Sequence, residues 1–192
     1  MFNLYSDALK YFVLLDYYGV SATQVELKKN LFGKPYFYKK SNGQEINLNI
    51  SHSGNFIIAG VNGYRLGVDI EKIERWPEQL SEDVFTKKEL SYIKHSKNEN
   101  IAKYRLWSLK EAITKYLGIG LLLDTLKIEI TCVNESMYVF KINQIRIDTY
   151  GLSFVKNGYV LSFVSNDKKI ELKKVNMSFV RKFISERLGD KK

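Results

Sequence analysis

The stretch LGVDIE, residues 66–71, has the apolar residues of a buried strand but also contains two carboxylates. Alternate residues of a strand face the same side, so Asp69 and Glu71 share one side and Val68 and Ile70 share the other. Two like charges held side by side raise each other's pKa, and a cation between them relieves the repulsion. Spacing alone therefore leaves two interpretations open: a metal site, or an edge strand whose carboxylates face water.

A third carboxylate lies in WSLKEAITK, residues 107–115. On a helix, Glu111 and Lys115 are one turn apart on the same face, and an exposed ion pair is the ordinary explanation of that spacing. Glu111 is also close to the apolar side of this helix, where an unpaired acid would be costly. Together with Asp69 and Glu71 it would suit Mg²⁺ or Mn²⁺, which complete their shells with water and substrate phosphates.

Two further motifs are compatible with anion binding. NISHSG, residues 49–54, places His52 after a strand and between two serines, and hydroxyls, turn amides and an imidazole can together hold a phosphate. A serine–histidine catalytic pair and a surface histidine are the alternatives. In FGKPY, residues 32–36, Gly33 and Pro35 restrict the backbone on both sides of Lys34 and so direct its side chain.

The composition predicts a folded protein with anionic partners. Lys and Arg outnumber Asp and Glu by 30 to 21, a net charge of +9, which attracts anions or simply keeps the surface soluble. Cys132 is the only cysteine, which excludes an internal disulfide and a cysteine-based zinc cluster, and we expect a buried thiol. No apolar run approaches the roughly 20 residues of a membrane helix, and no signal-peptide pattern is present, so we expect a cytoplasmic protein.

Hydrophobic periodicity predicts an α+β fold with a joint near residues 95–100. The expected helices cover residues 4–18, 82–94 (capped by Ser81), 100–117 and 178–188. The expected strands are INLNISHS (46–53), FIIAGV (56–61), LGVDIE (66–71), LKIEITC (126–132), MYVFKI (137–142), IRIDTY (145–150), YVLSFVS (159–165) and KIELKKV (169–175). The pair Asn62-Gly63 predicts a hairpin between FIIAGV and LGVDIE.

Taken together, the motifs resemble the 4′-phosphopantetheinyl transferases, in particular the larger single-chain kind that activates peptide and polyketide synthetases. The resemblance covers roughly residues 5–125, in the family's order and spacing. It rests on GKPY (33–36), NISHSG (49–54), LGVDIEKI (66–73), VFTKKE (84–89) and LWSLKEAITKYLGIGL (106–121).

The resemblance implies two similar α+β halves in a pseudo-twofold arrangement with the active site in the cleft between them, and we place these halves at residues 1–97 and 98–192. It also implies the residues of the site. The implied metal ligands for Mg²⁺ are Asp69, Glu71 and Glu111. The implied coenzyme A contacts are Lys34, Pro35, Ser51 and His52. The implied catalytic residues are Glu111, Lys115, which contacts the pyrophosphate, and Glu89, which lies near the attacking hydroxyl.

The reaction implied by the resemblance moves the 4′-phosphopantetheine arm from coenzyme A to a serine of a carrier protein and releases 3′,5′-ADP. The implied partner is an acidic acyl or peptidyl carrier protein of fatty-acid, polyketide or nonribosomal peptide synthesis. Nucleic acid and membranes are not expected partners, and a monomer is expected. The arginine that opens the family's first helix would fall near Phe2 and is absent, and Lys10 is a candidate replacement. Two other functions stay open: a metal-dependent nuclease, and a non-catalytic module that binds anions or carrier proteins.

Overall fold

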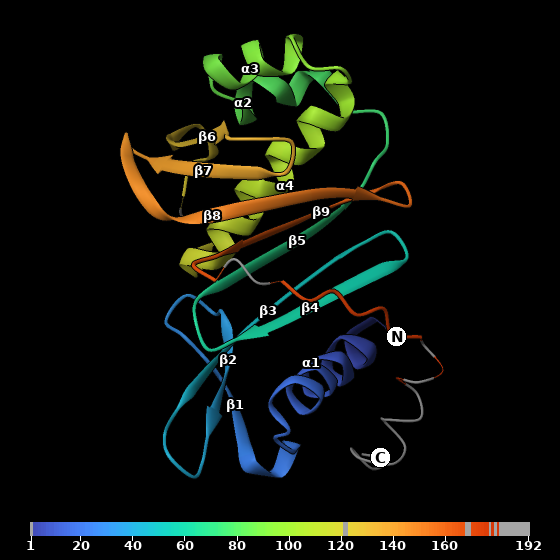
Figure 1. Cartoon of the computed structure of the whole chain (residues 1–192), viewed down its shortest axis with the longest axis vertical. Helices are drawn as coiled ribbons and strands as arrows, with labels where there is room; N and C mark the ends of the chain where they lie inside the picture. Colours follow the sequence, from blue (N-terminus) through green and yellow to red (C-terminus); the bar gives the residue numbers. More distant parts are fainter. Residues whose placement is uncertain (1, 121–122, 168–169, 177, 179, 181–192) are drawn as a thin grey trace.

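The computed structural model describes residues 2–120, 123–167, 170–176, 178 and 180. The fold is α+β, as predicted, and its strands form two antiparallel sheets (Figure 1). The first sheet has the order β1-β2-β3-β4 and the second has the order β5-β9-β8-β7-β6.

The first sheet follows an N-terminal helix, α1 (Phe2–Tyr18), which ends at Gly19 with a positive φ. Its strands are β1 (Val25–Lys29), β2 (Pro35–Lys39), β3 (Glu45–Ser53) and β4 (Phe56–Asn62). Helix α1 lies beside this sheet (Figure 1), and the core between them includes Leu14, Phe37 and Leu48. Strands β1 and β2 have no counterpart among the predicted strands. Strand β1 is short and mostly charged, so its sequence lacks the apolar alternation of a typical strand.

The second sheet carries the central helix of the molecule. Its strands are β5 (Leu66–Lys72), β6 (Ile128–Cys132), β7 (Met137–Ile142), β8 (Ile145–Lys156) and β9 (Tyr159–Ser165). Helix α4 (Glu99–Leu117) crosses one face of this sheet (Figure 1). Asn98 caps its N-terminus by accepting from Ile101 N, and Gly118 ends it in the left-handed conformation.

Two glycines allow α4 to lie close to the second sheet. A Cβ at Gly67 of β5 would lie 1.9 Å from the carbonyl oxygen of Ala112, and a Cβ at Gly151 of β8 would lie 2.8 Å from the Leu109 side chain. At Gly67 a larger residue would overlap the helix backbone, whereas at Gly151 it would displace the side chains of Phe140 and Leu109. Gly67 therefore sets the distance between α4 and β5, the two elements that carry the predicted carboxylates.

The predicted hairpin at Asn62-Gly63 is wrong. Strand β4 pairs with β3, and β5 pairs with β9, so the chain crosses from one sheet to the other at this point. A turn does form, since the Asn62 side chain accepts from Tyr64 N at 3.1 Å. The two-residue hairpin turn lies instead at Gly54-Asn55, between β3 and β4, where Gly54 has a φ of +52°.

The predicted helix over residues 82–94 is divided into α2 (Ser81–Val84) and α3 (Lys87–Lys94). Phe85 between them has extended backbone and a buried side chain, and Thr86 rather than Ser81 provides a side-chain cap, for α3. No strand is found over residues 170–175, where KIELKKV was predicted, and the predicted helix 178–188 lies almost wholly outside the described residues.

The two sheets change over between Asn62 and Leu66, well before the predicted boundary at residues 97 and 98. Strand β5 thus belongs to the sheet built mainly from the C-terminal half, and the predicted division of the chain stays a prediction. Within the described ranges, no helix is long and apolar enough to cross a membrane.

Candidate active site

Side chains from β3 join the two sheets. Alternate residues of a strand face one side, and the three at positions 49, 51 and 53 all bind β5. The Asn49 Oδ1 accepts from Val68 N at 2.7 Å. Further along, Ser53 Oγ accepts from Lys72 N at 3.0 Å. The motif NISHS is therefore a row of polar contacts that aligns β3 with the strand that carries Asp69 and Glu71.

Asp69, Ser51 and Lys115 form a compact triangle. Ser51 Oγ donates to Asp69 Oδ1 at 2.8 Å, and Lys115 Nζ donates to the same oxygen at 2.6 Å. Lys115 Nζ also lies 3.0 Å from Ser51 Oγ. Asp69 is only 2 % exposed, and its second oxygen, Oδ2, is buried without a hydrogen-bond partner among the described residues. Asp69 therefore has one oxygen committed and one that is available.

Glu71 is held at the edge of this triangle. Its Oε1 accepts from Trp107 Nε1 at 3.0 Å, and its Oε2 accepts from Ser53 Oγ at 3.2 Å. Burial raises the pKa of Glu71, and the negative charge of Asp69 raises it further, while these hydrogen bonds and the Lys115 charge act in the opposite direction.

Glu111 on α4 belongs to the same electrostatic neighbourhood. Burial raises the pKa of Glu111, the charge of Asp69 also raises it, and the ammonium of Lys115 opposes both. The charge of Asp69 thus raises the pKa of Glu71, on its own strand β5, and of Glu111, on helix α4. Hydrogen bonds link Lys115 and Ser51 to Asp69, and the charges of Asp69 and Lys115 act on both Glu71 and Glu111.

A divalent cation suits this donor set chemically. The three carboxylates are hard oxygen ligands, and Asp69 Oδ2 lacks a partner among the described residues. Burial is the main cause of the raised pKa values of the two glutamates, and a positive charge would offset both this cost and the added repulsion from Asp69. As placed, however, no group of three or more His, Cys, Asp or Glu side chains in the described part of the chain is arranged to hold a metal ion. The predicted metal site is therefore not preformed, and it stays a proposal.

The predicted coenzyme A contacts have different environments. Ser51 is buried against Asp69, whereas its neighbour His52 is exposed near the β3–β4 turn. Pro35 opens β2. Lys34 Nζ donates to Leu66 O at 2.9 Å and to Tyr116 O at 3.3 Å. Burial and the nearby Arg65 lower the pKa of Lys34 to about 8. Lys34 therefore links the start of β5 to the end of α4, and a contact with the nucleotide stays a prediction.

Glu89, the third predicted catalytic residue, is buried and fully paired. It is 1 % exposed, its Oε2 accepts from Thr86 N and pairs with Lys110 Nζ at 2.8 Å, and its Oε1 accepts from Ile130 N at 3.0 Å. Lys110 is fully buried and also donates to the carbonyl oxygens of Val84, Thr125 and Ile128. Glu89 therefore joins α3, α4 and β6, and its predicted place near the attacking hydroxyl stays a prediction.

Sequence reasoning missed three residues that orient the carboxylates: Asn49, Ser53 and Trp107. The period-2 spacing of Asn49, Ser51 and Ser53 could have indicated one polar face, but it did not reveal which strand that face contacts. Trp107 precedes Glu111 by one helical turn, which the spacing showed, but its bond to Glu71 depends on how α4 lies on β5.

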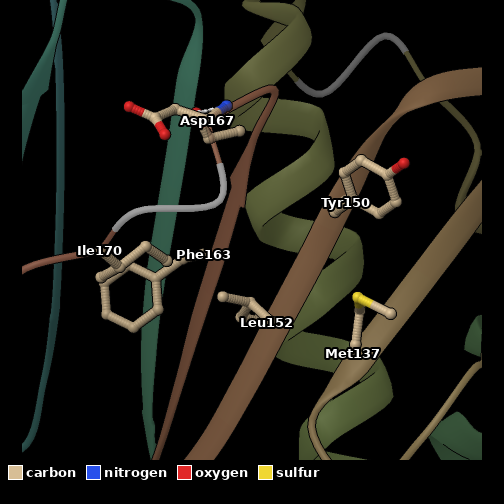
Figure 2. Close-up of a pocket in the computed structure, with 7 residues that line it drawn as sticks. Met137, Tyr150, Leu152, Phe163, Asp167 and Ile170 are labelled. Carbon is tan, nitrogen blue, oxygen red and sulfur yellow. Dashed lines mark hydrogen bonds between the residues drawn. The ribbon is translucent and has the colours of Figure 1, made fainter.

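The small cavity in Figure 2 is separate from this site. Its volume is about 70 Å³, and it is lined by Met137, Tyr150, Leu152, Phe163, Ser165, Asp167 and Ile170. In the register of the second sheet, Phe163 pairs with Val68, whose side chain points away from the face of Asp69. A broader groove of about 1310 Å³, between α1, β4 and residues 170–176, also borders Val68 rather than Asp69. Neither hollow contains the carboxylates.

Comparison with known proteins identifies the family. The family model "ACPS: 4′-phosphopantetheinyl transferase superfamily" matches residues 65–164, just over half of the chain, and this range includes all four clustered residues. The solved structure of Thermotoga maritima holo-[acyl-carrier-protein] synthase (AcpS) has a TM-score of 0.46 at 22% identity, over 62% of this chain and 73% of that one.

Curated relatives agree with the family match. The chain is 34% identical to the 4′-phosphopantetheinyl transferase ffp of Bacillus subtilis and 30% identical to the 4′-phosphopantetheinyl transferase Sfp of B. subtilis strain 168, in each case over 62% of this chain and 53% of the relative. It is 26% identical to the L-aminoadipate-semialdehyde dehydrogenase-phosphopantetheinyl transferase of Candida glabrata, over 78% of this chain and 63% of the relative. The chain spans about half the length of the B. subtilis relatives it matches. The chain belongs to the 4′-phosphopantetheinyl transferase superfamily.

Proposed function

We propose that the chain transfers the 4′-phosphopantetheine arm of coenzyme A to a serine of an acyl or peptidyl carrier protein and releases 3′,5′-ADP. The observation that carries this proposal is the cluster of Asp69, Glu71, Glu111 and Lys115 at the contact between β5 and α4, inside the range that matches the family. Family membership supports the reaction class. The cytoplasmic location, the monomeric state and the acidity of the carrier stay predictions.

The proposed reaction is a phosphoryl transfer that needs positioning and charge compensation. The serine oxygen attacks the β-phosphorus of coenzyme A, and a new O–P bond forms. The bond from this phosphorus to the bridging oxygen breaks, and its electron pair leaves with 3′,5′-ADP. Lys115 provides a positive charge at the site for the phosphate oxygens.

Glu111 is the residue that we assign to accept the serine proton. The described part of the chain gives its carboxylate no hydrogen bond or ion pair, and its raised pKa makes it a stronger base than an ordinary glutamate. Glu89, the other predicted candidate, has its carboxylate committed to backbone amides and Lys110.

The family resemblance also implies a magnesium ion, and the donor chemistry of the residues suits one, although the described side chains are not yet arranged around a common point. Asp69, Glu71 and Glu111 would hold it, because they offer hard oxygen donors and Asp69 Oδ2 has no other partner. When bound, the ion supplies positive charge against the pyrophosphate.

The test is the modification of an apo carrier protein. Incubation with coenzyme A and Mg²⁺ is expected to add about 340 Da, the mass of the arm, to the carrier in a mass spectrum. The variant Asp69→Ala is expected to lose this activity, whereas Glu45→Ala, which changes an exposed acid at the other end of β3, keeps it. Circular dichroism checks that both variants fold. If the wild-type protein leaves several apo carriers unmodified, the proposal is wrong.

The two alternatives predict different outcomes in the same experiment. A metal-dependent nuclease would shorten added DNA or RNA in the presence of Mg²⁺ and leave the carrier mass unchanged. A non-catalytic module would bind coenzyme A or the carrier without changing its mass, and Asp69→Ala would leave the affinity intact.

A further inference from the structure

The loop between β1 and β2 exposes two large apolar side chains. Leu31 is 98% exposed and Phe32 is 53% exposed, side by side at the loop's tip. A single exposed apolar residue is normal on a protein surface. Two adjacent ones at the tip of a loop form a small anchor that a partner could cover.

This loop is rigid. The Asn30 Oδ1 accepts from Phe32 N at 3.0 Å and from Lys34 N at 2.8 Å. The backbone of Asn30 donates to Lys34 O at 2.9 Å and accepts from Gly33 N at 3.0 Å. Gly33 has a φ of +86°, a conformation that other residues rarely adopt. The loop therefore presents Leu31 and Phe32 in one fixed shape, which lowers the entropy cost of binding a partner.

The loop is also attached to the elements that carry the site. Asn30 Nδ2 donates to Gly118 O at 2.9 Å, at the end of α4. Lys34 Nζ bridges Tyr116 O, next to Lys115, and Leu66 O, on the same strand as Asp69. A partner that covers the loop tip would therefore be held within a few residues of the ends of both site-bearing elements.

Basic residues flank the apolar tip. Lys29 is exposed just before it, and Lys28, which pairs with Glu26 at 3.3 Å, lies over the ring of Tyr38, 3.8 Å from its centre. An apolar anchor beside positive charges fits a protein surface that is apolar at its centre and acidic around it.

We propose that Leu31 and Phe32 form the docking surface for the acidic carrier protein that presents the acceptor serine. This inference rests on the proposed function, because only a transferase needs to hold a second protein beside the carboxylates. A small, transient contact is sufficient, since the carrier must leave after each transfer.

The experiment measures steady-state transfer with the double variant Leu31→Ser/Phe32→Ser. The KM for the apo carrier is expected to rise about tenfold or more, whereas kcat and the KM for coenzyme A change less than about twofold. The matched control is Ile145→Ser, because Ile145 is 69% exposed at the start of β8 in the other sheet. This control is expected to leave the carrier KM unchanged.

A charge variant tests the basic part of the surface. Lys29→Glu is expected to raise the carrier KM several-fold at about 50 mM salt and much less at about 300 mM, because salt screens exposed charges.

The outcomes separate this inference from the proposed function. If wild-type protein transfers the arm but the double variant has the wild-type carrier KM, the docking surface is elsewhere. If the KM for coenzyme A rises instead, Phe32 contacts the nucleotide and the inference is wrong. If wild-type protein transfers nothing, the proposed function itself fails. Thermal unfolding of each variant confirms that the exposed substitutions leave the fold intact.

Discussion

Glu111 and Glu89 show how the surroundings of one residue decide its role. Both are glutamates in helices, and both are named by the family resemblance. Burial and the charge of Asp69 raise the pKa of Glu111. The carboxylate of Glu89 instead accepts hydrogen bonds from two backbone amides and pairs with Lys110. A base has to exchange its proton with the substrate, which is the reason for proposing Glu111 rather than Glu89 in that role.

The substitution Glu111→Gln is expected to lower kcat at least about 100-fold, with little change in the free energy of unfolding. Burial and the charge of Asp69 raise the pKa of Glu111, and a bound cation would lower it. The kcat of the wild-type protein is expected to fall at low pH as Glu111 becomes protonated, and this fall is expected to move to lower pH as the Mg²⁺ concentration rises. A pH–rate profile at two Mg²⁺ concentrations measures the shift, and a profile that does not respond to Mg²⁺ would contradict the assignment.

The substitution Glu89→Gln is expected to do the opposite. It leaves the buried ammonium of Lys110 without its carboxylate and destabilises the fold by about 3 kcal/mol or more. Urea unfolding measures this loss. At a temperature where the variant is folded, kcat is expected to stay within about threefold of wild type, and a loss as large as that of Glu111→Gln would show that Glu89 takes part in the chemistry.

Lys34 predicts a specific pH dependence of stability. Its folded pKa is about 8, below its ordinary value of 10.5, so between these pH values the unfolded chain binds a proton that the native protein has released. Stability rises with pH wherever the unfolded state binds more protons. The unfolding free energy of wild type relative to Lys34→Met is therefore expected to increase from about pH 8 to about pH 10. Urea unfolding of both proteins measures this difference, and a constant difference would mean that the lysine is not desolvated.

At the scale of elements, the contact between α4 and β5 places the site. Lys115 and Glu111 come from the helix, Asp69 and Glu71 come from the strand, and Trp107 of the helix binds Glu71 directly. The close approach of the two elements depends on Gly67, where an added Cβ would overlap the helix backbone.

The substitution Gly67→Ala is expected to destabilise the protein by at least about 2 kcal/mol, because α4 must move away from β5. The folded variant is expected to lose transfer activity, since Lys115 moves away from Asp69. The matched control is Gly63→Ala, where the added Cβ would lie 3.5 Å from Tyr18 Oη, an ordinary contact, and a change within about 0.5 kcal/mol is expected. Equal effects at both positions would rule out the packing argument.

At the scale of the whole molecule, the second sheet joins distant parts of the chain. Strand β5 has β9 as its only hydrogen-bonded neighbour among the described strands, and nearly a hundred residues separate them. The first sheet in turn contacts β5 through side chains of β3. The predicted N-terminal half therefore contains the whole first sheet together with β5 of the second sheet, and the predicted C-terminal half lacks β5.

A fragment of residues 1–97 is consequently expected not to fold alone, because its β5 lacks both β9 and the covering helix α4. The measurement is circular dichroism and denaturant unfolding of the fragment, with the full chain as control. Mixing it with residues 98–192 is expected to restore cooperative unfolding. Independent, cooperative folding of the first fragment would support a domain boundary near residue 97.

The sequence by itself determined the features that depend on local order. Period-2 alternation put Asp69 and Glu71 on one side of a strand, helical spacing joined Glu111 to Lys115, and the motifs of the central region indicated the family. These patterns reflect backbone geometry, which repeats within a few residues. They therefore gave the α+β class and most of the clustered side chains.

Only the tertiary structure decided which separate segments meet. It placed β5 beside β9 rather than β4, buried Glu89 against Lys110, turned Lys34 towards backbone carbonyls, and brought Ser51 to Asp69. Each of these contacts joins residues far apart in the chain, and each depends on which partner satisfies a desolvated polar group or strand edge. Local sequence patterns do not indicate which distant segment becomes the partner, because the packing of the whole molecule decides it.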